Sequence, residues 1–467
     1  MRMEEIIWTL IFVLGAPGLV LPLIDYTRGT RVSPYITLLS TASAMVLLTT
    51  LIGKEATIFS GALRLDPLST YLSLIATLGS FLVTLASLSQ ARDWSTSPSL
   101  YSLVLLSLLG VYFLLYVNDA SVLIAAWALV AVASYVIVGI RKDESSLEAS
   151  VKYALMGVIS SSLLVFGVAL VFGVIRVSSL SPLERVPMGM NLILLVGVLL
   201  LISAFGFKMG VVPFHAWLPD VYGGAHPLLV SFVSGVIKLV SIGAFLRVLQ
   251  PLIQPIGYYW VITIALLSIL TMFYGNLAAL VQRNVQRMMA YSSIAQAGYF
   301  LIAFTALYSA ASRELALQAI GLQVTTYVLA KVGIFVGLGY LARKGFDLTL
   351  DGLKGVGRTM KMSCSMLAIL MFSLMGMPPL IGFWSKFMYV FLSVMDLAPW
   401  LALIGIVNSG ISVGYYALVI RYMYFANPAS GAVESMRDPE IYVLLVTGVL
   451  TTLLGLGFVD QLVKLLS

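Results

Sequence analysis

The sequence predicts an all-α polytopic membrane protein, and three observations support this fold class. Of the 467 residues, 60% are hydrophobic and only 10% are charged, whereas a soluble domain carries about 25% charged residues. The mean hydropathy is +1.02. Apolar runs of about twenty residues, the length that crosses a bilayer, recur along the whole chain.

About fourteen membrane-spanning helices are predicted from these runs. The first run, Ile6 to Ile24, lacks the small-residue cleavage site of a signal peptide, so we expect it to remain as a span. The linkers are short and leave no room for a soluble domain between helices. The predicted ranges are 5–24, 33–52, 69–88, 99–117, 120–140, 151–174, 190–213, 226–246, 257–280, 288–308, 316–342, 360–395 (broken), 399–422 and 441–463.

Prolines interrupt the seventh and twelfth predicted helices. Pro213 interrupts the seventh, and Pro378 and Pro379 interrupt the twelfth. Proline removes an amide donor, and irregular backbone persists at membrane depth only where it is buried or lines a cavity. Interrupted spans in corresponding halves are typical of a transport site between repeats. Prolines that merely occur in membrane helices are the alternative.

The five-helix spacing of the two interruptions suggests how the chain is divided. We expect an N-terminal three-helix segment, two five-helix repeats and a C-terminal helix. Their ranges are 1–98, 99–250, 251–424 and 425–467.

The distribution of basic residues predicts the orientation in the membrane. Loops after odd-numbered helices carry fifteen Lys and Arg residues, and loops after even-numbered helices carry six. By the positive-inside rule, the odd loops are cytoplasmic and both termini face outward. The net charge of +7 is modest and its basic residues are scattered, so we expect no nucleic-acid partner.

The content of Cys and His residues argues against a redox centre in this chain. Cys364 is the single cysteine, so neither an internal disulfide nor a cysteine-ligated cluster is expected. Two histidines, His215 and His226, cannot supply four axial ligands for a two-haem bundle. We therefore predict no cofactor and no metal in this chain.

Four lysines, Lys208, Lys238, Lys331 and Lys386, fall inside predicted helices. A lysine at mid-bilayer costs roughly 2.5–3.5 kcal/mol. One interpretation is snorkelling of the head group to the interface. The other is a row of protonatable groups facing the bundle interior, because burial disfavours the charged form and lets a lysine take up and release a proton.

The acidic residues all lie in loops or at predicted helix ends, so the interior is expected to be purely basic. Asp66, Asp119, Asp220 and Asp396 sit at such edges. The buried lysines must then rely on water, backbone carbonyls and hydroxyls, or remain neutral. Candidate hydroxyls, for which ordinary helix packing is the alternative role, are Ser203, Ser234, Ser241, Thr325, Thr326 and Tyr327.

Five sequence blocks resemble the antiporter-like membrane subunits of respiratory complex I (NADH:quinone oxidoreductase). The same family includes Mrp-type antiporter subunits and membrane subunits of energy-converting hydrogenases. The shape is closest to the subunit N type, the mitochondrial subunit-2 type, because no long lateral helix follows the fourteenth span. The blocks are FGFKMGVVPFHAWLPDVYGGAHP (205–227), FVSGVIKLVSIGAFLR (232–247), ALVQRNVQRMMAYSSIAQAGY (279–299), MGMPPLIGFWSKF (375–387) and SLEASVKYALMG (146–157).

The resemblance implies a fold, a role and partners. The fold is fourteen helices with two inverted five-helix repeats, each with a broken helix. The role is a proton-translocating, non-redox subunit of a redox-driven pump in the cell membrane, with electron transfer in partner membrane and redox subunits. No catalytic chemistry is expected in this chain itself. The electron donor and acceptor, the coupling ion and the flanking subunits stay open.

The resemblance also implies site residues. Lys208 is similar to the seventh-helix lysine of the family, Lys238 to its central-axis lysine and Lys386 to its terminal lysine. Lys331 falls where relatives often place another polar residue of the axis. His215 and Asp220, expected in a short loop after the seventh helix, either gate the site or anchor it.

One position departs from the family pattern. Relatives carry a glutamate in the fifth helix, and Ala128 stands in its place within WALVAVASY (127–135). Without this carboxylate, Lys208 loses an opposite charge that favours its charged form. Either a neighbouring subunit supplies an acid, or Glu144 or Glu148 takes part, or this copy pumps differently or not at all.

Three other readings remain. The chain is alternatively part of a multisubunit cation/proton antiporter or a membrane-bound hydrogenase. The absence of interior acids argues against direct sodium binding, since sodium prefers oxygen ligands. A non-pumping structural subunit is a second alternative, and a solitary transporter of an anionic solute is a third.

Overall fold

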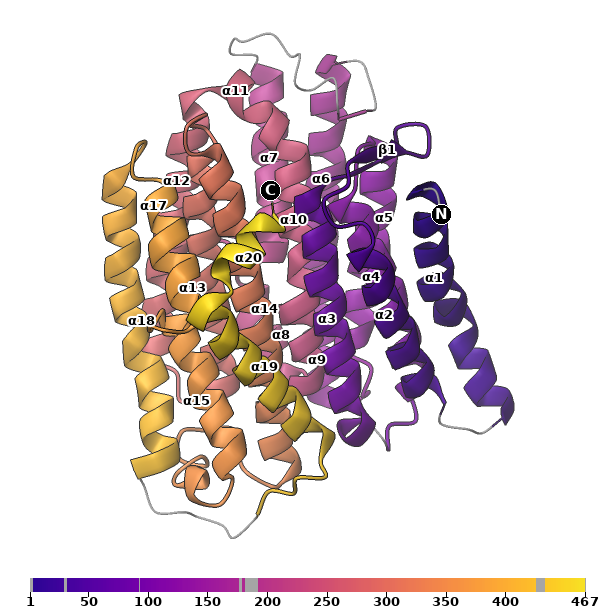
Figure 1. Cartoon of the computed structure of the whole chain (residues 1–467), viewed down its shortest axis with the longest axis vertical. Coiled ribbons are helices and arrows are strands. Elements are labelled where there is room, and N and C mark those ends of the chain that lie inside the picture. Colours follow the sequence, from indigo (N-terminus) through magenta and orange to yellow (C-terminus); the bar gives the residue numbers. More distant parts are fainter. Residues whose placement is uncertain are drawn as a thin grey trace.

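Nearly all of the chain forms one bundle of steeply inclined helices (Figure 1). The computed structural model describes residues 3–28, 32–91, 93–175, 179–180, 192–425 and 433–466, and the side chains of 25–28 are excluded. Within these ranges, eleven helices are long and apolar enough to cross a membrane, and two shorter apolar helices accompany them. The predicted fold class is thereby confirmed, while the count of fourteen spans stays a prediction.

The N-terminal third contains six helices and a small hairpin. Helix α3 begins where Asp66 accepts a hydrogen bond from the Ser69 amide at 2.8 Å, which satisfies one of the free amides of the first turn. The elements are α1 (Met3–Arg28), α2 (Ser33–Thr49), β1 (Ala56–Ile58), β2 (Leu63–Leu65), α3 (Pro67–Gln90), α4 (Ser97–Leu115), α5 (Ala120–Val138) and α6 (Glu144–Ile175).

The middle third contains the first broken helix and the most buried elements. Helix α9 continues through a π-helical segment, η2, directly into α10. The elements are α7 (Leu192–Met209), α8 (Trp217–Gly224), α9 (Pro227–Phe232), η2 (Val233–Ile237), α10 (Lys238–Leu249), η3 (Gln250–Leu252), α11 (Ile253–Ile256), α12 (Tyr258–Leu280), α13 (Val285–Ala306) and α14 (Arg313–Arg343).

The last third contains the second broken helix, whose second half includes another π-helical segment, η5. The elements are η4 (Val356–Arg358), α15 (Lys361–Met375), α16 (Ile381–Phe383), η5 (Trp384–Val390), α17 (Phe391–Ser393), α18 (Pro399–Phe425), α19 (Pro439–Gly457) and α20 (Val459–Lys464).

The two breaks share a local design. Each helix stops at a glycine in the left-handed region, Gly210 with φ +79° and Gly376 with φ +89°. Glycine adopts this conformation without a Cβ penalty, which makes it the usual residue after a helix C-terminus. A proline follows three residues later in both, as predicted.

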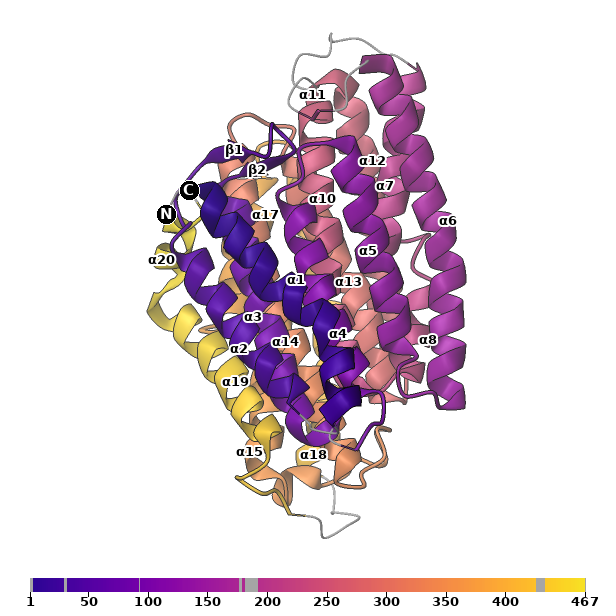
Figure 2. The same cartoon turned by 90° about the vertical axis from the view of Figure 1, so that its right-hand side faces the viewer.

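The two broken helices run in opposite directions. In both views of the bundle, α7 lies above α8, whereas α15 lies below α17 (Figures 1 and 2). This arrangement supports the inverted relation that the family resemblance implies.

Helix α14 forms the centre of the bundle, and the most apolar stretch of this helix is entirely buried. It contacts α3, α13, α15 and α19. Two glycines one turn apart, Gly333 and Gly337, permit this approach: a Cβ at Gly333 would lie 2.5 Å from the Thr447 hydroxyl. Small residues four apart let membrane helices pack closely.

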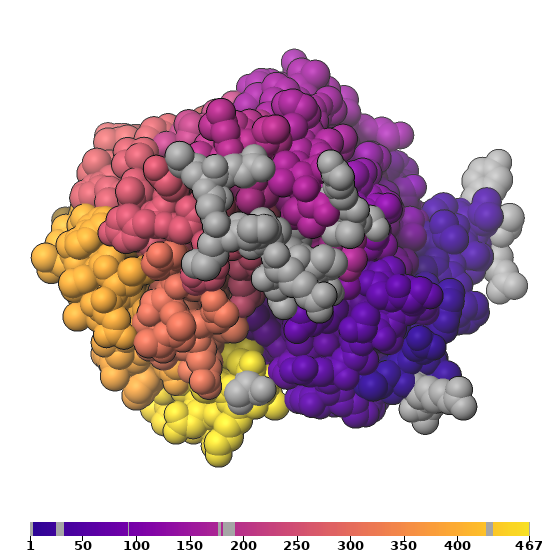
Figure 3. Space-filling model, turned by 90° about the horizontal axis from the view of Figure 1, so that it is seen from above, coloured from indigo at the N-terminus to yellow at the C-terminus, as the bar shows by residue number. Residues whose placement is uncertain are grey.

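The C-terminal helices pack beside the N-terminal third of the bundle. Seen from above, the yellow C-terminal residues adjoin the dark violet part of that third, while the indigo start of the chain lies at the right-hand edge (Figure 3). Helix α19 packs on α3 as well as on α14, so the C-terminal helix ties the N-terminal segment to the bundle centre.

The structure corrects several predicted boundaries. The sixth helix begins at Glu144 instead of 151, and the seventh ends at Met209 instead of 213. Residues 217–224, expected in a loop, form α8, because the chain resumes a helix after the proline break. The final span ends at Gly457, and α20 follows it separately.

Two further differences concern the loops. The hairpin β1–β2 was not predicted, because three-residue strands carry too little periodicity and its turn places Phe59 and Ser60, both non-glycine, at positive φ. Several arginines used to predict orientation lie outside the described residues or side chains. These are Arg28, Arg31, Arg92, Arg176 and Arg185.

A buried ion pair fastens α19 to α14. The Glu440 carboxylate is fully buried and accepts hydrogen bonds from Arg343 Nε at 2.9 Å and Nη2 at 3.2 Å. Arg343 also pairs with Asp438 at 2.9 Å. Removing one partner of such a pair leaves an uncompensated charge.

We predict that Glu440→Ala destabilises the protein by about 2–3 kcal/mol, at the low end for buried pairs because Arg343 keeps Asp438. The unfolding midpoint of the purified protein in detergent should fall by several degrees. Glu314→Ala is the control, because that exposed carboxylate bonds only to Gln318, at 3.2 Å. Equal unfolding midpoints for both variants would show that the Glu440–Arg343 ion pair adds no stability.

Candidate functional site

The four predicted lysines are buried in the protein interior. Their exposed fractions are 3% for Lys208, 2% for Lys238 and 0% for Lys331 and Lys386. Snorkelling to the membrane surface is therefore excluded. None of the ion pairs among the described residues involves one of these four lysines.

Lys386 occupies the second helix break. Its Nζ donates to the Leu374 carbonyl at 2.5 Å and lies 4.2 Å from the centroid of the Tyr299 ring. Leu374 is in the last turn of α15, where carbonyls lack intrahelical partners and carry partial negative charge. The break thus supplies the acceptor that a buried ammonium needs.

Lys331 and Lys238 are both held by α13. Lys331 Nζ donates to the Met289 carbonyl at 2.9 Å and to Ser292 Oγ at 2.8 Å. Lys238 Nζ donates to the Ser293 carbonyl at 2.6 Å. One ring, that of Tyr327, lies between the two lysines, with centroids 4.9 Å from Lys238 Nζ and 6.0 Å from Lys331 Nζ.

One face of α13 therefore serves three lysines. Met289, Ser292, Ser293, Gln296 and Tyr299 follow the three- and four-residue spacing that puts side chains on one helix face. These contacts were not predicted from the sequence, although the block 279–299 resembles the family. The sequence pattern could have predicted this face, since polar residues recur at helical spacing within an otherwise apolar span.

A hydrogen-bonded chain extends from this face towards the second break. Gln323 donates to Gln296 Oε1 at 2.9 Å, and Ser385 Oγ donates to Gln323 Oε1 at 2.9 Å. Thr326 Oγ1 lies 3.1 Å from Ser385 Oγ. These groups connect α13 and α14 to η5, the segment that contains Lys386.

Lys208 lies in a separate aromatic cluster. Its Nζ donates to Ser134 Oγ at 3.2 Å. The ring centroids of Trp127, Tyr135 and Tyr153 lie 5.8, 5.4 and 5.4 Å from Nζ. These contacts come from α5 and α6.

The structure brings three of the four lysines together. Lys331 lies within electrostatic range of both Lys238 and Lys386. Between the Lys208 cluster and this group, the Tyr222 ring stands 5.6 Å from Phe335 and 6.2 Å from Trp217. Aromatic side chains thus occupy the space between the two clusters.

Both π-helical segments adjoin a buried lysine. Lys238 directly follows η2, and Lys386 lies within η5. π-Helical turns are rare and often mark functional sites, because the wider turn loosens the regular hydrogen-bond ladder.

The hydroxyl groups predicted beside the lysines have other partners. Ser203, Thr325 and Thr326 donate to carbonyls four residues earlier. Ser241 donates to the Lys238 carbonyl, and Ser234 bonds to Tyr327. Of the predicted set, only Tyr327 faces lysine ammonium groups, because the actual hydroxyl partners, Ser134 and Ser292, come from helices not expected to lie there.

His215, Asp220, Glu144 and Glu148 are not among the hydrogen-bond partners of the four buried lysines. Asp220 in α8 pairs with Arg287 at 3.1 Å and Lys152 at 3.4 Å, so it anchors α8 to α13 and α6. Glu148 pairs with Lys152 at 2.7 Å, and Glu144 is exposed in the first turn of α6. The His215 ring packs 4.2 Å from Tyr274.

The energetics allow both protonation states of a lysine in these settings. A hydrogen bond to a charged group contributes about 1.5–3 kcal/mol, and a desolvated cation–π contact about 2 kcal/mol. The cost of a lysine at mid-bilayer is roughly 2.5–3.5 kcal/mol. The contacts of a buried ammonium thus contribute free energy of the same order as the cost of its burial.

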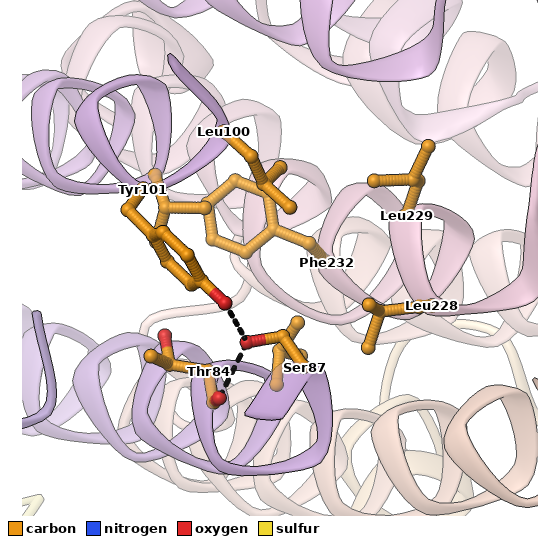
Figure 4. Close-up of a pocket in the computed structure, with 9 residues that line it drawn as sticks. Thr84, Ser87, Leu100, Tyr101, Leu228, Leu229 and Phe232 are labelled. Atoms are coloured by element: carbon orange, nitrogen blue, oxygen red, sulfur yellow. Dashed lines mark hydrogen bonds between the residues drawn. The ribbon is translucent and has the colours of Figure 1, made fainter. Parts of the chain in front are cut away.

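Two cavities lie apart from the lysines. One, between α3, α4 and α9, holds about 10 Å³, and there the Tyr101 hydroxyl meets Ser87 at 2.9 Å (Figure 4). It is scarcely large enough for one water. The other, of about 870 Å³, is bordered by Asp66, Arg247 and Arg313. No group of three His, Cys, Asp or Glu side chains suited to a metal occurs among the described residues.

Comparison with known proteins gives one family match and many relatives. Residues 118–412 match the family NADH:quinone oxidoreductase/Mrp antiporter, TM. The chain is 31% identical to F(420)H(2) dehydrogenase subunit N of Methanosarcina mazei, covering 92% of this chain and 91% of that protein. It is 31% identical to NADH-quinone oxidoreductase subunit N of Granulibacter bethesdensis, covering 96% and 95%.

Solved structures share the fold. A chain of respiratory complex I from Thermus thermophilus aligns with a TM-score of 0.81 and 28% identity, over 96% of this chain and 97% of that one. A chain of the archaeal membrane-bound sulfane sulfur reductase aligns with a TM-score of 0.89 and 23% identity, over 98% and 95%.

We predict that the four buried lysines resist amine-reactive labelling in native membranes, because their Nζ atoms have no access to reagent. Lys54 and Lys142, which are exposed, should be modified first, and the buried four only after unfolding. Peptide mass spectrometry measures the rate at each site. Equal rates for Lys238 and Lys54 would contradict the buried arrangement.

Proposed function

The chain belongs to the NADH:quinone oxidoreductase/Mrp antiporter membrane family, and on that premise we propose that its four buried lysines move protons. It is an antiporter-like, multi-pass subunit of the subunit N type. The single observation that carries the proposal is the α13 face, which contacts three buried lysines: its carbonyl and hydroxyl oxygens accept from Lys238 and Lys331, and its Tyr299 ring faces Lys386.

The arrangement suits stepwise proton transfer. Each ammonium raises the energy of charge on its neighbour, because like charges repel strongly where the dielectric constant is low. A proton on Lys331 therefore disfavours one on Lys238 or Lys386, which lie within electrostatic range. Release at one position favours uptake at the next.

The roles implied by the family resemblance follow this geometry. Lys238 and Lys331 form the middle of the path, and Lys386 at the second break forms its end. Lys208 forms the opposite end of the path, beside the first break at Pro213. Pro378 and Pro379 precede Lys386 and leave the Leu374 carbonyl to it. Tyr327 stands between the two middle lysines.

The energy for transport would come from partner chains. In this proposal, redox cofactors reside in other subunits and none in this chain, and the complex lies in the cell membrane. Both termini would face outward, and the repeats would span 99–250 and 251–424. α1 begins and α20 ends in the upper half of the same view, which supports an even number of crossings (Figure 1).

Membership of a cation/proton antiporter assembly is the second candidate, favoured by the Mrp members of the family. Sodium prefers oxygen ligands such as carboxylates, and the groups that face the interior axis are cationic. The geometry therefore favours protons. A purely structural copy, suggested by Ala128, would have little use for four buried lysines.

Isolation of the tagged protein from native membranes under mild conditions tests the assembly. Co-purifying iron–sulfur and quinone-site subunits would support a redox-driven pump. Small antiporter-type membrane partners alone would support the second candidate, and a chain purified without partners would contradict both.

We predict that Lys238→Ala lowers proton translocation by the assembled complex at least several-fold relative to electron transfer, because the middle of the path is lost. Native gels would show unchanged assembly. Lys54→Ala removes an exposed loop lysine and should preserve translocation. Undiminished translocation in assembled Lys238→Ala would contradict the path.

We predict that Ser292→Ala weakens translocation two- to fivefold, because Lys331 loses its hydroxyl partner and keeps the Met289 carbonyl as its hydrogen-bond acceptor. The Tyr416 hydroxyl loses the same partner. The expected weakening corresponds to about 0.5–1 kcal/mol, within the range of one hydrogen bond. Thr305→Ala is the matched control on the same helix, since its buried hydroxyl bonds to the Leu301 carbonyl and to no other group in the described part of the chain. Equal effects of the two would assign Ser292 to packing.

A further inference from the structure

We infer that Trp127, Tyr135 and Tyr153 form an aromatic box that holds the Lys208 ammonium where relatives use a glutamate. The inference rests on the proposed function and names the groups that stabilise charge at Lys208. It addresses the departure at Ala128, which leaves α5 without any acidic residue between Ala120 and Val138.

The box surrounds the ammonium closely. Three ring centroids lie 5.4–5.8 Å from Nζ, within the distance at which a ring face attracts a cation. Ser134 Oγ, at 3.2 Å, supplies the hydrogen-bond acceptor. Lys208 is only 3% exposed, so competing water is scarce and the attraction of the rings is strong.

The rings are held in place by their own contacts. Trp127 Nε1 donates to Ser161 Oγ at 3.2 Å. The Tyr153 ring stacks on Trp217 at 4.3 Å with planes 9° apart. Trp217 Nε1 in turn donates to the Phe207 carbonyl at 2.9 Å, next to Lys208 itself. The box is therefore tied to both halves of the first broken helix.

Gly157 on α6 makes room for the Tyr135 ring. A Cβ built at Gly157 would lie within 1.9 Å of the Tyr135 hydroxyl oxygen. Only glycine at 157 allows Tyr135 its observed position. Tyr135 meets Tyr153 edge to face at 4.7 Å, so the close helix approach at Gly157 completes the box.

The available acids lie elsewhere. Glu148 is exposed and paired with Lys152, and Asp220 pairs with Lys152 and Arg287. An ammonium held by rings differs from one in an ion pair, because no carboxylate competes for its proton. Lys208 can then release a proton without first separating from a counter-charge.

Proton translocation by the assembled complex in sealed vesicles tests the box, normalised to electron transfer. The proton translocation that Lys208→Ala loses, relative to the unmodified protein, defines the contribution of Lys208. Tyr153→Leu should reduce that contribution about three- to tenfold, and Tyr153→Phe, which keeps the ring, should retain most of it. Phe172→Leu is the matched control, since this buried ring of α6 is not among those facing Lys208.

Ala128→Glu provides a readout that packing alone would not move. Adding Ala128→Glu to Tyr153→Leu should restore at least half of the Lys208 contribution that Tyr153→Leu loses. If Tyr153→Leu does not assemble, Trp127→Leu takes its place. Failure of this rescue, or full activity of both ring-loss variants, would overturn the box and leave the proposed function standing. No loss in Lys208→Ala would overturn the proposed function at this position, and the box with it.

Discussion

A cation buried within the membrane must find its partners inside the protein, and much of this structure follows from that constraint. The four lysines are almost fully buried, and no acidic side chain pairs with them among the described residues. The chain meets the requirement with backbone carbonyls, hydroxyls and aromatic faces. Carbonyls serve Lys238, Lys331 and Lys386, and Ser134 with three rings serves Lys208.

The need of a buried ammonium for acceptors helps to explain the broken helices and the π-helical segments. The end of a helix leaves carbonyls without internal partners, and Lys386 uses one of these, whereas Lys238 and Lys331 use carbonyls of the unbroken helix α13. A glycine in the left-handed region ends α15 at Met375 and leaves the Leu374 carbonyl for Lys386. At the first break, the freed Phe207 carbonyl is taken by Trp217, which supports the rings around Lys208. Irregular backbone thus lies beside Lys208, Lys238 and Lys386, and at the second break it supplies the acceptor directly.

The sequence predicted the parts of this account that depend on composition and local rules. Hydropathy located most of the long helices among the described residues, although α6 begins at Glu144 and not at 151 and α8 was expected as a loop. Proline positions located both breaks. The four lysines stood out because charge is rare in apolar runs. The partners could not be predicted in the same way, since Ser134 and Lys208 are 74 residues apart in the sequence and meet only in the folded bundle. The polar face of α13 was visible as a pattern, but its three lysines come from other helices.

The central claim is that these lysines must release their protons and do not merely hold a fixed positive charge. Replacing Lys331 with arginine separates the two possibilities, because arginine keeps the charge and does not deprotonate in proteins. The measurement is the number of protons translocated per electron pair by the assembled complex in sealed vesicles. Our account predicts that Lys331→Arg loses the contribution of this subunit as fully as Lys331→Met does. Translocation that persists in the arginine variant and fails in the methionine variant would show that a static charge suffices.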